Sequence, residues 1–377
     1  MQGLLNDSKE YFSKLQAKRK QGVPVVGYIP NGYLPVELIR ACGAEPLALF
    51  QGGEASPVLA ATPCLGRFLD PFSRAQIGYR LENKSPPYQM IDRLIVPMTD
   101  QHARGIADAW HFYTDVEVFE LGVPKAKTPQ ALDYYFEGLL RLKSFLETLT
   151  GTEITDQRLQ TAVAKSNRVR ELLKKISLLR TANPPLIGGK EFIQLMHQSY
   201  YMDEDFLIRS LEEVFKQRKD LAVTDSSKSR ILLVGATLAH GDYRVVDLLE
   251  QAGASVVMEH FSEGMSGYWR TLEVKDDPIS DVARYYLMEK EPGAFFRDAT
   301  KERFSFFKDL IDAFNVDGVV WYSLMFRETY DIEQYLFSQA PGLKDLPLLS
   351  LKSNYDAGET GALRTRIETF VTNIKRG

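Results

Sequence analysis

The chain has 377 residues, 44% of them apolar and 25% charged, which is ordinary for a globular protein. Its formal net charge of -4 gives no basic excess that would favour nucleic acid or an anionic membrane. Only Cys42 and Cys64 are present, which excludes a disulfide scaffold, and no apolar run reaches the roughly 20 residues needed to span a bilayer. Met1–Lys20 lacks a signal-peptide pattern, so we expect a cytoplasmic protein.

The chain opens with a helical pattern and continues as alternating strands and helices. Leu4, Leu5, Tyr11, Phe12 and Leu15 recur at helical spacing and predict an N-terminal helical arm over residues 1–22. Over residues 23–128, short apolar runs separated by helical stretches predict a first α/β lobe with a parallel sheet. The predicted strands cover residues 25–29, 46–50, 94–96 and 116–119.

Residues 129–222 predict a helical linking segment. One long amphipathic helix ends near Gly151, Thr155 is a candidate N-cap for the next, and two more follow a break at 183–189. A polar stretch over 223–229 is a candidate linker into a second α/β lobe, 223–377. Its predicted strands cover 231–234, 256–258, 319–321 and 346–349, and its last helix 358–375. The predicted fold class is therefore α/β, with two lobes that each hold a roughly four-stranded parallel sheet.

Common catalytic and nucleotide-binding motifs are missing from the sequence. There is no phosphate-binding G-x-x-x-x-G-K-[ST], no G-x-G-x-x-G fingerprint and no G-x-S-x-G elbow. The five histidines never occur at the H-x-x-x-H spacing of a helical zinc site. An unrelated hydrolase or metal enzyme would therefore lack its triad or its ligands, and these patterns alone predict a two-lobed α/β protein with a cleft.

A series of segments resembles one known family. Leu34-Pro35-Val36-Glu37-Leu38-Ile39-Arg40-Ala41-Cys42-Gly43-Ala44-Glu45-Pro46 is similar to its "P-x-E-L-I-x-A-A-G-A-x-P" helix and turn. Similar segments follow in the family's order at 136–168, 230–235, 249–254, 317–320 and 361–370. Together they cover about residues 24–371 and resemble the 2-hydroxyacyl-CoA dehydratase / benzoyl-CoA reductase family.

This resemblance implies a subunit of an anaerobic heterodimer. Each subunit of the family typically binds a [4Fe-4S] cluster through three cysteine thiolates at the interface of its lobes. A separate ATP-dependent iron–sulfur activator protein delivers one electron, and the acyl-CoA substrate becomes a ketyl radical anion. The implied reaction is radical dehydration of a 2-hydroxyacyl-CoA or, alternatively, reduction of an aromatic acyl-CoA as in benzoyl-CoA reductase.

The cluster-ligand positions implied by the resemblance hold only one cysteine here. The first falls on Cys64, the second on Thr99, next to Asp100, and the third on Arg327. Threonine is a poor iron ligand and a guanidinium is no ligand, whereas these clusters strongly prefer thiolates. Cys42 stands where the family has alanine, and we expect it in the core.

Three interpretations of this cysteine-poor site are open. The leading one is a subunit that lacks a conventional cluster and works with a cluster-bearing homologous partner. The others are an atypical cluster on Cys64 with Asp100, His102 or an external ligand, and a remodelled pocket for another small ligand. A non-catalytic scaffold of the same fold is a further alternative.

The singled-out residues also have purely structural explanations. Cys64 could be a buried loop cysteine, Thr99 and Asp100 could cap the next helix, and Arg327 could pair with Glu328 or Glu333 on the surface.

Overall fold

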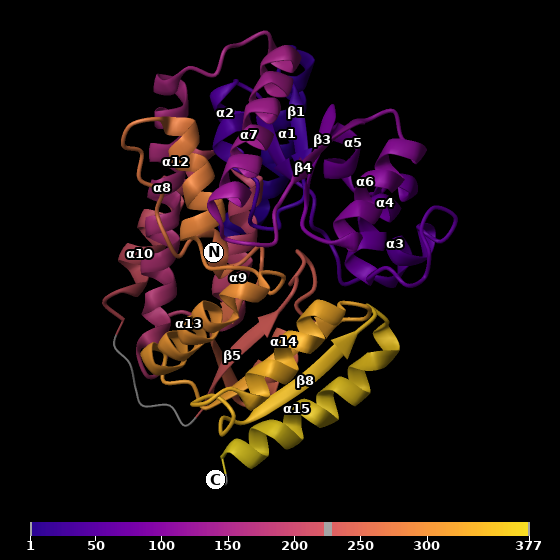
Figure 1. Ribbon diagram of the computed structural model, residues 1–377. Coiled ribbons are helices and arrows are strands. Elements are labelled where there is room, and N and C mark those ends of the chain that lie inside the picture. Colours follow the sequence, from indigo (N-terminus) through magenta and orange to yellow (C-terminus); the bar gives the residue numbers. More distant parts are fainter. Residues whose placement is uncertain (1, 222–227, 376–377) are drawn as a thin grey trace.

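A computed structural model describes residues 2–221 and 228–375, with side chains from residue 10 onward. Two four-stranded parallel sheets flanked by helices form the two lobes, which confirms the predicted α/β class (Figure 1). The side chains of the predicted apolar positions Leu4 and Leu5, and residues 223–227 of the candidate linker, lie outside this description. No helix in the described part of the chain is long and apolar enough to cross a membrane.

The first sheet has the strand order β2-β1-β3-β4. Its strands are β1 (Val25–Tyr28), β2 (Glu45–Ala48), β3 (Arg93–Met98) and β4 (Glu117–Gly122). Helix α1 (Gln2–Lys20) precedes the sheet, and the helices of this lobe are α2 (Val36–Ala41), α3 (Ala55–Ala60), α4 (Pro71–Glu82), α5 (Pro86–Met90) and α6 (Gln101–Tyr113). Helices α2 and α6 pack on the strands, and α4 packs on α6. Each predicted strand overlaps an observed one. The strands β1, β2 and β3 were recognisable because strands covered on both faces form continuous apolar runs, whereas β4 is partly exposed.

Long helices follow the first sheet, at the predicted positions. They are α7 (Pro129–Thr150), α8 (Asp156–Leu178), α9 (Gly189–Gln198) and α10 (Glu204–Arg218), with 3-10 turns at Leu179–Thr181 and Ser199–Tyr201. Gly151 ends α7 in the left-handed conformation, with φ of 64°. The Thr155 hydroxyl accepts a hydrogen bond from the Arg158 N–H, which confirms the predicted N-cap of α8.

The second sheet repeats the topology of the first, with the order β6-β5-β7-β8. Its strands are β5 (Ser229–Gly235), β6 (Ala254–His260), β7 (Gly318–Leu324) and β8 (Leu348–Ser353). The helices of this part are α11 (Arg244–Gln251), α12 (Pro278–Arg284), α13 (Thr300–Ala313), α14 (Glu328–Gln339) and α15 (Thr360–Ile374). Short helical turns lie at Met265–Gly267, Tyr285–Glu289, Arg297–Ala299 and Ala357–Glu359.

One helix of the second half packs away from its own sheet. Although α12 follows β6 in sequence, it packs against α7 and α8, beside the first lobe (Figure 1). The chain after β6 therefore crosses to the linking helices and returns through α13 to β7.

A buried ion pair fixes the linking helices to the second sheet. Arg180, just after α8, contacts Glu259 on β6 at 2.5 Å, and both side chains are fully buried. The Tyr268 hydroxyl donates to the same carboxylate at 2.7 Å. Arg180 and Glu259 can both be charged here only because they pair, since an unpaired buried charge destabilises the folded state.

We predict that Arg180→Met destabilises the protein by about 3–5 kcal/mol, since Glu259 would remain buried without its cation. Urea unfolding at neutral pH measures the change. The matched control is Lys165→Met, which removes the exposed Lys165–Asp205 pair and should cost less than about 1 kcal/mol. If both substitutions lowered the free energy of unfolding by the same amount, the buried Arg180–Glu259 pair would not stabilise the fold as inferred.

Candidate functional site

The two sheets direct their topological switch points toward one shared cavity. In each sheet the two central strands, β1 with β3 and β5 with β7, lead to connections that run in opposite directions. Ligands of open α/β sheets bind outside the carboxyl ends of such strands. A small cavity of about 30 Å³ lies there, lined from the first lobe by Asn31, Thr99 and Asp100 and from the second by Thr237, Glu263 and Arg327.

Arg327 joins the lobes at this cavity. It follows Phe326, whose positive φ of 71° turns the chain after β7. Its Nη1 lies 3.2 Å from Asp100 Oδ2 and 3.6 Å from Asp70 Oδ2, and the side chain is 12% exposed. Burial opposes the charge of Arg327, but Asp100 and Asp70 outweigh it and raise the pKa of the guanidinium.

The surface pairing considered for Arg327 is therefore wrong. Glu333 is itself buried and pairs with Arg303. Arg327 reaches back into the first lobe because the turn at Phe326 aims it inward, toward two carboxylates that cap helices there.

Asp100 performs the predicted capping role and a second role as well. Its carboxylate accepts hydrogen bonds from the backbone N–H groups of His102 and Ala103, both at 2.9 Å, at the start of α6. Its other oxygen faces Arg327. The cap and the ion pair thus share one carboxylate, and the capping interpretation alone is incomplete.

Asp70 was not singled out from the sequence, yet it is central to the site. It caps α4, accepting from the Ser73 N–H at 2.9 Å and the Ser73 hydroxyl at 2.7 Å. His102 Nδ1 lies 2.9 Å from Asp70 Oδ2 and 3.2 Å from the Asp70 backbone nitrogen, so one ring nitrogen faces both an acceptor and an N–H donor of Asp70. Burial opposes ionisation, but the His102 hydrogen bond and the Arg327 charge lower the pKa of Asp70 to about 2.

Thr99 is buried beside this network, with its hydroxyl already engaged. Asn31 Nδ2 donates to the Thr99 hydroxyl oxygen at 3.3 Å and to the Pro97 carbonyl at 2.8 Å. These bonds connect the loop after β1 to the end of β3. The role of Thr99 in this arrangement is to join two strand ends.

Cys64, at the first of the three cluster-ligand positions, does not line the cavity. It lies half-buried in the turn after α3, where its N–H donates to the Ala61 carbonyl at 3.0 Å. Burial raises the pKa of its thiol. The same loop reaches the second lobe through Phe68, whose ring packs edge-on against Phe326 with centroids 5.7 Å apart. Cys42, in contrast, is fully buried in the core, as predicted.

Glu263 is a second site residue without a sequence signal. It lies in the turn after β6, is 2% exposed, and accepts a hydrogen bond from the Leu238 N–H. No cation pairs with it among the described residues. Burial raises the pKa of this carboxyl to about 8, so it is mostly protonated at neutral pH and can donate a hydrogen bond into the cavity.

These side chains do not fit a cubane cluster. The three positions offer one thiol outside the cavity, one hydroxyl held by Asn31 and one guanidinium paired with two carboxylates. Such clusters need several thiolates from the protein. Over residues 10–221 and 228–375, no three His, Cys, Asp or Glu side chains gather closely enough to hold a metal ion.

The Asp70 contacts make the stability of the protein dependent on pH. A pKa of about 2, below the ordinary 3.8, means that Asp70 stabilises the fold above about pH 4 and loses this contribution as the pH falls towards 2. We predict a loss of about 2 kcal/mol over that window, which Asp70→Asn should remove. Urea unfolding at stepped pH measures it, with the exposed Asp312→Asn as control. If the free energy of unfolding fell equally with pH in wild type and in Asp70→Asn, the ionisation of Asp70 would not be the cause of the pH dependence.

Comparison with known proteins supports the resemblance across nearly the whole chain. The sequence model of the family described as "2-hydroxyglutaryl-CoA dehydratase, D-component" matches residues 31–374. "Putative dehydratase subunit YjiM" of Escherichia coli (strain K12) is 23% identical over 366 residues, which cover 96% of this chain and 94% of that protein. A protein of Thauera aromatica that is named as a subunit of benzoyl-CoA reductase is 20% identical, over 93% of this chain and 91% of its own length.

A further relative is the "(R)-phenyllactyl-CoA dehydratase beta subunit" of Clostridium sporogenes. It is 19% identical over 97% of this chain and 96% of its own length. Among solved structures, one titled "crystal structure of SsGBP and GDP complex" aligns with a TM-score of 0.23 and 10% identity, over 94% of this chain and 99% of that one. That structural similarity is too low to carry an argument. The family match spans most of the chain, so the chain belongs to the 2-hydroxyglutaryl-CoA dehydratase, D-component family.

Proposed function

We propose that this chain is a subunit of a 2-hydroxyacyl-CoA dehydratase-type complex that has no conventional [4Fe-4S] cluster of its own. In this proposal the cluster is bound by a homologous partner, and a separate ATP-dependent iron–sulfur activator serves that partner. The observation that carries the proposal is the ion pairing of Arg327, at the third ligand position, with Asp100 and Asp70.

The relatives support the subunit assignment. Proteins named as subunits of benzoyl-CoA reductase and of two acyl-CoA dehydratases match this chain over more than nine-tenths of its length. Dehydration is the favoured reaction class, because the family and two of these three relatives are named for it. The acyl-CoA substrate would be shared with the partner.

An atypical cluster on Cys64 is disfavoured because Asp100 and His102, its possible further ligands, already have other partners. Asp100 is committed to the α6 N-terminus and to Arg327, and His102 is committed to Asp70. Recruiting Asp100 would leave Arg327 without one of its two carboxylates, and recruiting His102 would remove its contact with Asp70. In the proposed function these residues instead hold the lobes in their relative position, so that the subunit presents a fixed surface to its partner.

The proposal predicts low iron content for the isolated chain. After strictly anaerobic purification, wild type and Cys64→Ser should both contain well below about one iron and one acid-labile sulfide per chain. A family member with cysteines at all three positions, prepared in parallel, controls for cluster loss. About four irons per wild-type chain, lost in Cys64→Ser, would overturn the proposal.

A further inference from the structure

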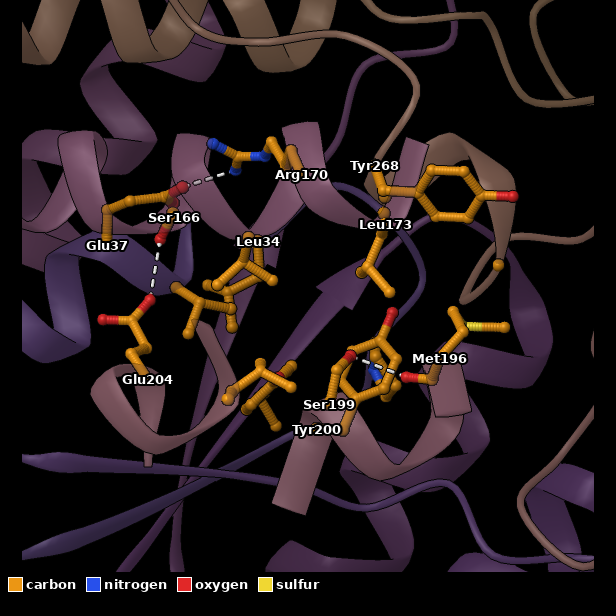
Figure 2. A pocket seen from close by; sticks show the side chains of 18 of the residues that line it. Leu34, Glu37, Ser166, Arg170, Leu173, Met196, Ser199, Tyr200, Glu204 and Tyr268 are labelled. Carbon is orange, nitrogen blue, oxygen red and sulfur yellow. Dashed lines mark hydrogen bonds and ion pairs between the residues drawn. The ribbon is translucent and has the colours of Figure 1, made fainter. Parts of the chain in front are cut away.

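A second cavity, separate from the candidate site, lies between the linking helices and both lobes. It has a volume of about 140 Å³ and opens between α2, α8, α10 and the loop after β6. Figure 2 shows Leu34, Leu173, Met196, Tyr200 and Tyr268 around it. An engineered apolar cavity of about 150 Å³ holds benzene, so this one has room for a ring-sized group.

Most polar side chains of this wall satisfy one another. Arg170 pairs with Glu37, and the Tyr286 hydroxyl donates to the other oxygen of Glu37 at 2.9 Å. On another side, Arg40 lies 3.2 Å from Glu204. Figure 2 shows the Glu37–Arg170 and Ser166–Glu204 contacts at the edge of the cavity. These paired groups have little capacity left for a ligand.

Lys290 is the exception. Its side chain lines the cavity although the residue is only 5% exposed. The ammonium donates one hydrogen bond, to the Gly32 carbonyl at 2.8 Å, and lies 5.0 Å from the centre of the Tyr286 ring. Among the side chains described from residue 10 onward, no carboxylate lies within 4.0 Å of it. An ammonium has three donors, so two remain for another partner.

The surrounding charges do not neutralise Lys290. The carboxylates that act electrostatically on Lys290 are Glu291, which pairs with Arg270 at 2.5 Å, and Glu37, which pairs with Arg170. The three cations Lys290, Arg170 and Arg270 therefore face only the two carboxylates of Glu37 and Glu291. One positive charge, that of Lys290, remains unpaired at the edge of the cavity. Buried charges in proteins are normally paired, and the adjoining empty volume is where a counter-charge can enter.

We propose that this cavity binds a small organic carboxylate with a compact apolar body, and that the carboxylate pairs with Lys290. The apolar wall formed by Leu34, Leu173 and Met196 would cover the body of the ligand. A single unpaired cation matches a monoanion, whereas a phosphate dianion would need several more free donors. This inference stands independently of the proposed function, because it uses none of the residues at the candidate site.

The proposal predicts how affinity depends on pH. Burial and the neighbouring Arg170 lower the pKa of Lys290 to about 8. Only the ammonium pairs with a carboxylate, so affinity should be constant between about pH 6, where the ligand is ionised, and about pH 7, and should fall above about pH 8. The titratable and charged groups that face Lys290 or its backbone from the packed elements are Tyr33, Glu37, Lys127, Arg170, His260, Tyr286, Glu291, Arg303 and Tyr330.

Isothermal titration calorimetry with benzoate, and with the smaller isobutyrate, tests the site. We expect saturable binding of at least one of them, and at least about tenfold weaker binding of the matched neutral amide. Lys290→Met should weaken carboxylate binding by at least about tenfold, while Lys308→Met, at an exposed lysine, should leave it unchanged. Val169→Phe, which narrows the cavity without touching a charge, should also weaken binding and serves if Lys290→Met does not fold.

The results that would overturn the proposal are distinct from these. Absence of saturable binding of both carboxylates to the wild-type chain would do so. Equal affinity for carboxylate and amide, or full affinity in the folded Lys290→Met variant or in Val169→Phe, would do so as well. The calorimetric measurement does not depend on iron content. The proposed function can therefore be contradicted while the carboxylate site is confirmed, and the carboxylate site can be contradicted while the proposed function is confirmed.

Discussion

The guanidinium of Arg327 lies between the two sheets, and its ion pairs connect the two lobes. Both sheets point their central strand ends at the same space, so whatever lies there touches both lobes. Arg327 lies there, and its charge is balanced by Asp100 and Asp70 from the opposite lobe. Because an unpaired charge in this space would be strongly destabilising, the pairing also constrains how the lobes sit on each other.

The same contact connects several local structures. Asp70 caps α4 and Asp100 caps α6, so each carboxylate is already oriented by backbone N–H groups before Arg327 approaches. His102, in the first turn of α6, then holds Asp70 from the other side. Three thiolates around a cluster would tie the lobes through iron, whereas here a network of charges and caps makes the connection between them.

The amino-acid sequence predicted the framework because its signals are local. The strands β5 and β7 are fully buried and contain the apolar runs 231–234 and 319–321. Gly151 and Thr155 mark helix ends by their own chemistry. The resemblance then located the ends of the strands where Thr99, Asp100 and Arg327 meet.

What the sequence did not predict depends on contacts between distant segments. Asp70 and His102 are 32 positions apart and meet only because α4 packs against α6. Glu263 and Lys290 look like surface residues in the sequence, since nothing local indicates that the crossing through α12 buries them. Arg327 had nearby acidic residues on its own helix, yet the turn at Phe326 directed it to the other lobe.

The central claim is that ion pairs of Arg327 with Asp100 and Asp70 connect the lobes of this chain in place of a [4Fe-4S] cluster, which its partner retains. The most direct measurement is the iron content of the native complex, isolated anaerobically through a tag on this chain and resolved into its subunits. The account predicts about four irons per pair, all remaining with the partner. About eight irons per pair, or iron that stays with this chain after separation, would contradict it.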